Sequence, residues 1–239
     1  MIELFQAYWQ PLLYTDGVKL TGLAMTLWLL VASLLIGALI ALPLAVARTA
    51  GGRWMRTAVR SFTYVFCGTP LYIQLLICYS GLYGLDVIKS SEVLRVFFKN
   101  GLNCAILAFA LNSAAYTTEI LAGAMRTLPP GEIEAARAYG LPAWKVQCFV
   151  IVPAALRRAL PYYSNEVILL LHATSIAFAA TVPELMKVTR DINGQTYMTF
   201  QVFAVAALLY AVVSLVIVWM FRRAEIKWLR FLHPVVDNK

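Results

Sequence analysis

The sequence has little charge: 13% of its 239 residues are Asp, Glu, Lys or Arg, whereas 61% are hydrophobic and the mean hydropathy is +0.73. Soluble domains carry roughly 25% charged residues, so this composition excludes an ordinary soluble protein. Lipid must be the solvent for most of the chain. Polar stretches stay below about forty residues, too short for a domain that folds unaided. We therefore predict a single membrane domain over residues 1–239.

Motifs for nucleotide binding and for common hydrolases are absent. There is no GxxxxGK[ST] phosphate loop, no HExxH and no GxSxG. The two histidines are His172 and His233, and no cysteine pair has CxxC spacing, which predicts free thiols and no metal site. We expect no catalysis and no cofactor bound by this chain, and transport, channel or scaffold activity remains.

Five apolar runs are long enough to cross a bilayer, which needs roughly 20 helical residues. Their lack of polar alternation favours helices over barrel strands. We predict an all-α membrane protein with five transmembrane helices, at residues 20–47, 62–83, 102–125, 159–180 and 200–221. Asn165, Glu166 and His172 interrupt the fourth run, and Pro70 predicts a bend in the second.

The basic residues predict the orientation. In the five-helix arrangement most of them follow the first run, the third run and the last run, all on one side. The positive-inside rule makes this side cytoplasmic, so the N-terminus is expected in the periplasm and the C-terminus in the cytoplasm. Contact with lipid headgroups explains the charge better than nucleic acid binding does, because no soluble fold presents it. Residues 1–19 are predicted as an amphipathic interfacial segment, not a cleaved signal.

A loop at about residues 127–158 has the signals of a short cytoplasmic helix. Pro130 or Gly131 would begin it, and early acidic residues suit the positive end of the helix dipole. Gly140 allows the left-handed turn that ends a helix, and Pro142 prevents its continuation. Small alanines at 135, 136 and 138 would form a smooth face for another protein. A helix that only caps the bundle is the alternative.

Part of this loop resembles a known motif. Glu134, Ala135 and Ala136, followed by Gly140 and by residues 150–153, are similar to the EAA motif of permease subunits of bacterial ABC importers. Valines replace the usual Ile and Leu in the last stretch. In that family the motif forms a coupling helix that docks into the cytoplasmic ATPase. The resemblance therefore implies that Glu134, Ala135, Ala136 and Gly140 are the coupling residues.

The resemblance covers nearly the whole chain. Several stretches resemble the polar amino-acid family of permeases. Within that family, the resemblance is to permeases for histidine and for lysine, arginine and ornithine. The stretches are residues 68–75, 112–119, 163–167, 181–185 and 190–193. Cys67 departs from the usual Arg. The family implies a type I ABC importer permease fold in the bacterial inner membrane. It also implies four kinds of partner: a second homologous permease, two ATP-binding cassette subunits that bind ATP and Mg, a periplasmic amino-acid-binding protein, and membrane lipid.

Polar residues inside the spans are the candidates for substrate contact. A charged group in a span is costly and should face a partner or a wet cavity. Glu166, beside Asn165, would attract a cationic side chain, and the family resemblance implies a substrate pocket there; pairing with Arg158 or protonation is the alternative. His172 and Gln74 are candidates for the same cavity or for hydrogen bonds between helices. Glu119 is expected to be structural.

The resemblance implies a permease subunit of an ATP-driven importer for basic or polar amino acids, which works by alternating access. Opines or other amino acids are alternative substrates. An ion-coupled secondary carrier would predict inverted repeats and more ionisable residues in the spans, and a scaffold would make both intramembrane acids structural.

Overall fold

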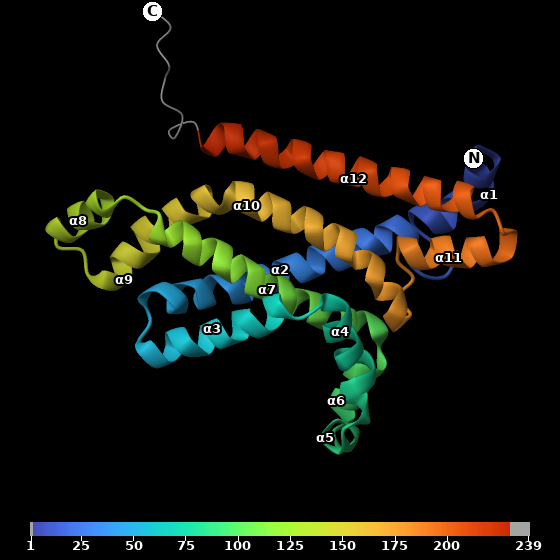
Figure 1. Ribbon diagram of the computed structural model, residues 1–239, viewed down its shortest axis with the longest axis horizontal. Coiled ribbons are helices and arrows are strands. Elements are labelled where there is room, and N and C mark those ends of the chain that lie inside the picture. Colours follow the sequence, from blue (N-terminus) through green and yellow to red (C-terminus); the bar gives the residue numbers. More distant parts are fainter. Residues whose placement is uncertain (1, 230–239) are drawn as a thin grey trace, which may run out of the picture.

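A computed structural model describes residues 2–229, and all its regular elements are helices. Figure 1 shows α2, α7, α10 and α12 running along the long axis of the molecule. In chain order the helices are α1 (Ile2–Leu13), α2 (Gly22–Ala50), α3 (Arg53–Gly68), α4 (Leu71–Leu76), η1 (Ile77–Gly81), η2 (Leu82–Gly84), α5 (Asp86–Ser90), α6 (Glu92–Lys99), α7 (Gly101–Arg126), α8 (Pro130–Ala138), α9 (Ala143–Val146), η3 (Gln147–Ile151), α10 (Val152–Ala173), η4 (Thr174–Ala180), α11 (Leu185–Thr196) and α12 (Thr199–Trp228).

Three helices are long and apolar enough to cross a membrane: α2, α7 and α12. They contain most of the first, third and fifth predicted runs. α3 and the segment Leu71–Gly84 would form a fourth span if the two are taken together. The described residues thus hold three or four candidate spans. The basic residues that follow the last predicted run include Arg230 and Lys239, and these two lie outside the described residues.

The second predicted run is broken. α3 begins at Arg53, nine residues before the expected start, and the chain turns by 101° between α3 and the segment Leu71–Gly84. The expected bend at Pro70 is confirmed, because Thr69 and Pro70 have extended backbone between the helices. Beyond this bend, α4, α5 and α6 form an arm that projects away from the bundle (Figure 1).

The fourth predicted run is also placed differently. α10 begins at Val152, seven residues early, and ends at Ala173, where the 3₁₀ helix η4 continues to Ala180. Its early start lies before Arg157 and Arg158, which lower the hydropathy of the second turn. α10 packs beside α7 and α12. At about 1.5 Å per residue, its 22 residues extend about 33 Å.

α7 is the centre of the bundle, packed against α2, α3, α4 and α10. Its faces toward α2 and α10 are built from small side chains, among them Ala105, Ala108, Ser113 and Ala114, all buried. Small residues allow helix backbones to approach closely in lipid, where the hydrophobic effect does not drive helices together. Close packing against α7 therefore holds the bundle together.

The end of the bundle that carries α1 and α11, called here the α1 end, is tied by polar contacts. Glu184 caps α11, accepting hydrogen bonds from the backbone N–H groups of Met186 (2.7 Å) and Lys187 (2.8 Å). Its carboxylate also accepts from the Tyr210 hydroxyl of α12 at 3.2 Å. Thr26 of α2 accepts from the Leu185 N–H at 3.0 Å. These contacts fix α2, α11 and α12 to one another.

The N-terminal helix α1 contributes to the protein core. Leu12 of α1 is fully buried against Leu185 and Val202, while Trp9 is 40% exposed. Leu12 therefore belongs to the protein core, and the interfacial placement of the segment stays a prediction.

One glycine permits a close backbone contact at this end. A Cβ at Gly101, the first residue of α7, would lie 1.8 Å from the carbonyl oxygen of Ala180. Backbone atoms cannot move aside as a flexible side chain would. Gly123, near the other end of α7, has nothing within 4 Å of the same position. These two glycines form a matched pair.

We predict that Gly101→Ala destabilises the protein by about 1–3 kcal/mol, because overpacking forces the backbone apart. Gly123→Ala should be neutral or slightly stabilising, since alanine is the better helix former. Thermal unfolding of the two variants in detergent checks this. Equal unfolding midpoints for both variants would contradict the packing described for Gly101.

Candidate functional site

The predicted short helix exists as α8. Pro130 occupies its first turn, and Tyr139 N–H closes the end by donating to Ala135 O at 3.1 Å. Gly140 then adopts a left-handed φ of 76°, and Leu141 N–H donates to Ala136 O at 3.3 Å. Pro142 precedes the next helix, α9. Both the helix and its glycine terminator are confirmed.

The exposed face of α8 differs from the expected alanine face. Glu134 and Ala135 are exposed, and Tyr139 is 88% exposed, whereas Ala136 is only 9% exposed. Ala136 therefore packs inward against its own loop. Of the predicted coupling residues, Glu134, Ala135 and Gly140 are accessible to a partner protein. Figure 1 places α8 and α9 at the extremity of the molecule, called here the coupling end.

The break between α3 and α4 is held by polar side chains. The Gln74 amide donates to Phe66 O (2.8 Å) and Thr69 O (3.0 Å), and the Asn112 amide of α7 donates to Phe66 O at 2.9 Å. The Tyr116 hydroxyl, one turn along α7, donates to Cys67 O at 3.2 Å. Carbonyls freed at a helix break must be satisfied inside the protein where no water reaches them. The Gln74 side chain therefore stabilises the bend by donating hydrogen bonds to its free carbonyl groups.

Glu119 is held between helices, as expected for a structural acid. Its carboxylate accepts from the Thr63 hydroxyl of α3 at 2.7 Å and from Arg48 Nε of α2 at 3.3 Å. Three helices therefore meet at one carboxylate. Its charge is balanced by Arg48.

Glu166 is in a different situation. Its residue is 6% exposed, yet its carboxylate has no hydrogen bond or ion pair with any residue from 2 to 229. The Glu166 carboxylate lies close enough to the side chains of Cys67, Tyr116 and Tyr163 to interact with them electrostatically. Arg158, considered as a partner from the sequence, pairs instead with Glu132 at 3.7 Å. Its oxygens are not fully enclosed, so the carboxylate is largely buried but keeps access to an opening, which makes this position the strongest candidate for substrate contact.

The other predicted substrate residues do not converge on Glu166. Asn165 is exposed on the neighbouring side of α10. His172 faces α12, where its Nε2 lies 3.3 Å from the Ser214 hydroxyl. Gln74 is 7% exposed and occupied by the bend. Of the four, Glu166 combines a largely buried position with a carboxylate that bonds to no described residue.

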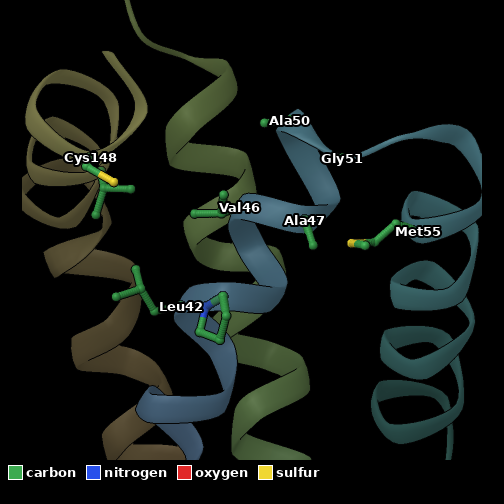
Figure 2. A pocket seen from close by; sticks show the side chains of 9 residues that line it. Leu42, Val46, Ala47, Ala50, Gly51, Met55 and Cys148 are labelled. Carbon is green, nitrogen blue, oxygen red and sulfur yellow. The ribbon is translucent and has the colours of Figure 1, made fainter. Parts of the chain in front are cut away.

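Two apolar hollows lie on the coupling half of the bundle. Tyr163, one turn before Glu166, lines a hollow of about 620 Å³ between α2, α7 and α10. A second hollow, of about 570 Å³, lies where α2 ends and η3 begins. Figure 2 shows Val46 and Ala47 of α2 between Cys148 on one side and Met55 on the other. Leu42 lines both hollows, which are therefore neighbours along α2.

The helical fold and the matched residues define an inner-membrane permease component. The chain matches the family described as "Binding-protein-dependent transport system inner membrane component" over residues 33–228. It belongs to this family.

The relatives described below are transport permeases, not enzymes. The chain is 54% identical over 234 residues to the histidine/lysine/arginine/ornithine transport system permease protein HisM of Escherichia coli K12, covering 98% of each chain. Identity to HisM of Salmonella typhimurium LT2 is 55% over 230 residues, with 96% of this chain and 98% of that one covered. The octopine transport system permease protein OccM of Rhizobium radiobacter is 35% identical over 206 residues, covering 86% of this chain and 84% of OccM.

Solved structures share the fold. A chain in the crystal structure of an amino acid ABC transporter with histidines superposes with a TM-score of 0.75 at 29% identity, covering 86% of this chain and 92% of that one. A chain of the methionine ABC transporter MetNI, in an inward-facing conformation, superposes with a TM-score of 0.65 at 20% identity, covering 84% and 93%. The type I importer permease fold expected from the sequence is confirmed.

Sequence reasoning missed how several polar residues are used. Asn112 and Tyr116 belong to a stretch that resembles the permease family, and in the structure both hold the bend between α3 and α4. Their spacing of four on an otherwise apolar helix is a signal for a shared polar face. Glu184 and Tyr210 carry no local signal of their contact, because it joins residues 26 positions apart.

We predict that Asn112→Ala lowers stability by about 1 kcal/mol, since it removes hydrogen bonds to Phe66 O and to Gln74. Asn165→Ala is the matched control, because Asn165 is exposed on α10 and bonds to no described residue. Thermal unfolding in detergent should separate the two variants. If Asn165→Ala is the less stable, the network does not hold the bend.

Proposed function

We propose that this chain is the permease subunit of an ATP-driven importer for basic amino acids. The single observation that carries the proposal is an exposed, glycine-terminated helix with Glu134 and Ala135 on its surface, in a chain 54% identical to a histidine/lysine/arginine/ornithine permease. The chain has no phosphate loop, so ATP and Mg would be bound by a partner. Alternating access would be driven through α8.

The proposed assembly contains two permeases, two ATP-binding cassette subunits and a periplasmic amino-acid-binding protein, in the bacterial inner membrane. A second permease is physically reasonable because α12 leaves much of its surface without a partner: among its thirty residues, Val202, Val205 and Ala206 are buried. Whether that second permease is a homologue or another copy decides the symmetry of the pathway.

We propose five membrane crossings, with the N-terminus in the periplasm and the C-terminus in the cytoplasm. The three apolar spans α2, α7 and α12 would be joined by the bent α3–α4 segment and by α10 with η4. The length of α10, about 33 Å, supports a crossing despite its polar turns. The coupling end would then face the cytoplasm, where an ATPase is available.

Glu166 would contribute to the substrate pocket. A cationic amino-acid side chain would supply the missing partner of its carboxylate, in a region of low dielectric where the attraction is strong. The nearby Tyr163 hollow offers room at the same level of α10. Asn165 and His172 would contact the substrate from the edges of this pocket. Gln74 would contribute indirectly, by fixing the bend between α3 and α4 beside the pocket. Opines remain the second candidate substrate class, on the 35% identity to OccM.

We predict that Glu134→Lys leaves the bundle folded but uncouples import from ATP hydrolysis. The reversed charge on an exposed helix face should disturb docking, not packing. The measurement is import into vesicles that contain all subunits, together with co-purification of the ATPase. The control Lys187→Glu changes an exposed charge on α11 and should leave both readouts unchanged. Normal coupled import by Glu134→Lys would refute docking at this residue.

We predict that Glu166→Gln reduces import of arginine and lysine roughly tenfold or more, and import of neutral amino acids less, because only cationic substrates lose an ion pair worth about 1.5–3 kcal/mol. Competition in the reconstituted importer measures this ratio. Glu119→Gln serves as the comparison, since it weakens a contact between helices and should affect all substrates alike. An equal loss for both substrate classes in Glu166→Gln would make that carboxyl structural.

A further inference from the structure

An ion pair joins the coupling helix directly to the helix that carries Glu166. Arg158 Nη2 of α10 lies 3.7 Å from Glu132 Oε1 in the first turn of α8. The Arg158 side chain is 20% exposed and that of Glu132 is 46% exposed. Glu132 lies two residues before the coupling residue Glu134, so the pair sits at the base of the docking surface.

α10 connects this pair to the substrate candidate. Arg158 and Glu166 belong to the same helix, eight residues or about 12 Å apart. Pro161 between them removes one backbone hydrogen bond, but the helix continues through it. Any axial or rocking movement of α10 at Arg158 must therefore also move the Glu166 carboxylate.

The covalent route from α8 to α10 is less direct. It passes through the turn at Gly140, the four-residue α9 and the π-helix η3 (Gln147–Ile151). π-helices are rare and mark irregular, adaptable points in a helix. The 570 Å³ hollow lies beside η3, and Val152 is among its lining residues. Figure 2 shows Cys148 on the side of the hollow opposite Met55. A push on α8 along this route would be absorbed by a segment that has empty space next to it.

We propose that the Glu132–Arg158 pair is a strut that transmits movement of α8 to α10. Both are positioning residues: they act through α10 on Glu166 and do not touch substrate. This inference rests on the proposed function, since it needs an ATPase that moves α8. An exposed ion pair adds little to stability, so a purely structural role predicts almost no phenotype when it is broken, whereas the strut predicts lost coupling.

The test is a charge swap in the complete reconstituted importer, with the ratio of arginine imported to ATP hydrolysed as the readout. Glu132→Arg and Arg158→Glu should each lower this ratio by roughly three- to tenfold, a range typical of residues that couple distant sites. The double variant, which restores opposite charges, should recover most of it. The unfolding midpoint and the amount of co-purified ATPase should stay unchanged in all three.

Lys187 and Asp191 provide a matched control, because they form an exposed ion pair within α11 at the opposite end of the bundle. Swapping them should not change the ratio. Unchanged coupling in both single variants would overturn the strut, and so would a double variant as impaired as the singles. Loss of bound ATPase in Glu132→Arg would also overturn it, by placing Glu132 in the docking surface. Failure of the unmodified complex to hydrolyse ATP would instead refute the proposed function.

Discussion

Lipid provides no hydrogen bonds, so polar groups inside this bundle must be satisfied by the protein itself. Most of the unusual contacts follow from this constraint. The bend after Gly68 exposes carbonyls, and Gln74, Asn112 and Tyr116 cover them. Buried hydroxyls of Ser33, Ser113 and Thr117 have no partner among the described residues, but neutral hydroxyls cost far less than a charge. Against this background an unpaired carboxylate is informative.

The two ends of the molecule differ in how firmly they are built. At the α1 end, Glu184, Thr26 and Tyr210 tie three helices, and Gly101 lets backbone touch backbone. At the coupling end, short helices and a π-helix connect α7 to α10, and two apolar hollows lie along α2. The irregular connection between α7 and α10 makes the coupling end the more adaptable one, where whole helices could rock against one another.

The sequence was sufficient for features set by local chemistry. Long apolar runs gave α2, α7 and α12, and proline and glycine punctuation gave α8 and its left-handed end at Gly140. It failed where tertiary contacts decide. α3 begins before the predicted second run because its first turns are amphipathic, and a search for apolar runs does not detect them. The segment after Pro70 turns by 101° from α3, whereas hydropathy predicts one straight span. The inward face of Ala136 and the choice of Glu132 as partner for Arg158 depend on how the loop folds back.

Glu119 and Glu166 show why chemistry at one position has to be judged from its surroundings. Both are single acids within predominantly apolar helices, and hydropathy treats them alike. Glu119 meets Arg48 and Thr63, so its charge is already balanced by the fold. Glu166 is more deeply buried and has no such partner among the described residues. An uncompensated charge of this kind costs several kcal/mol, and the fold gains nothing from it. A basic amino acid in transit would supply the cation that this carboxylate lacks, which is the role proposed for Glu166.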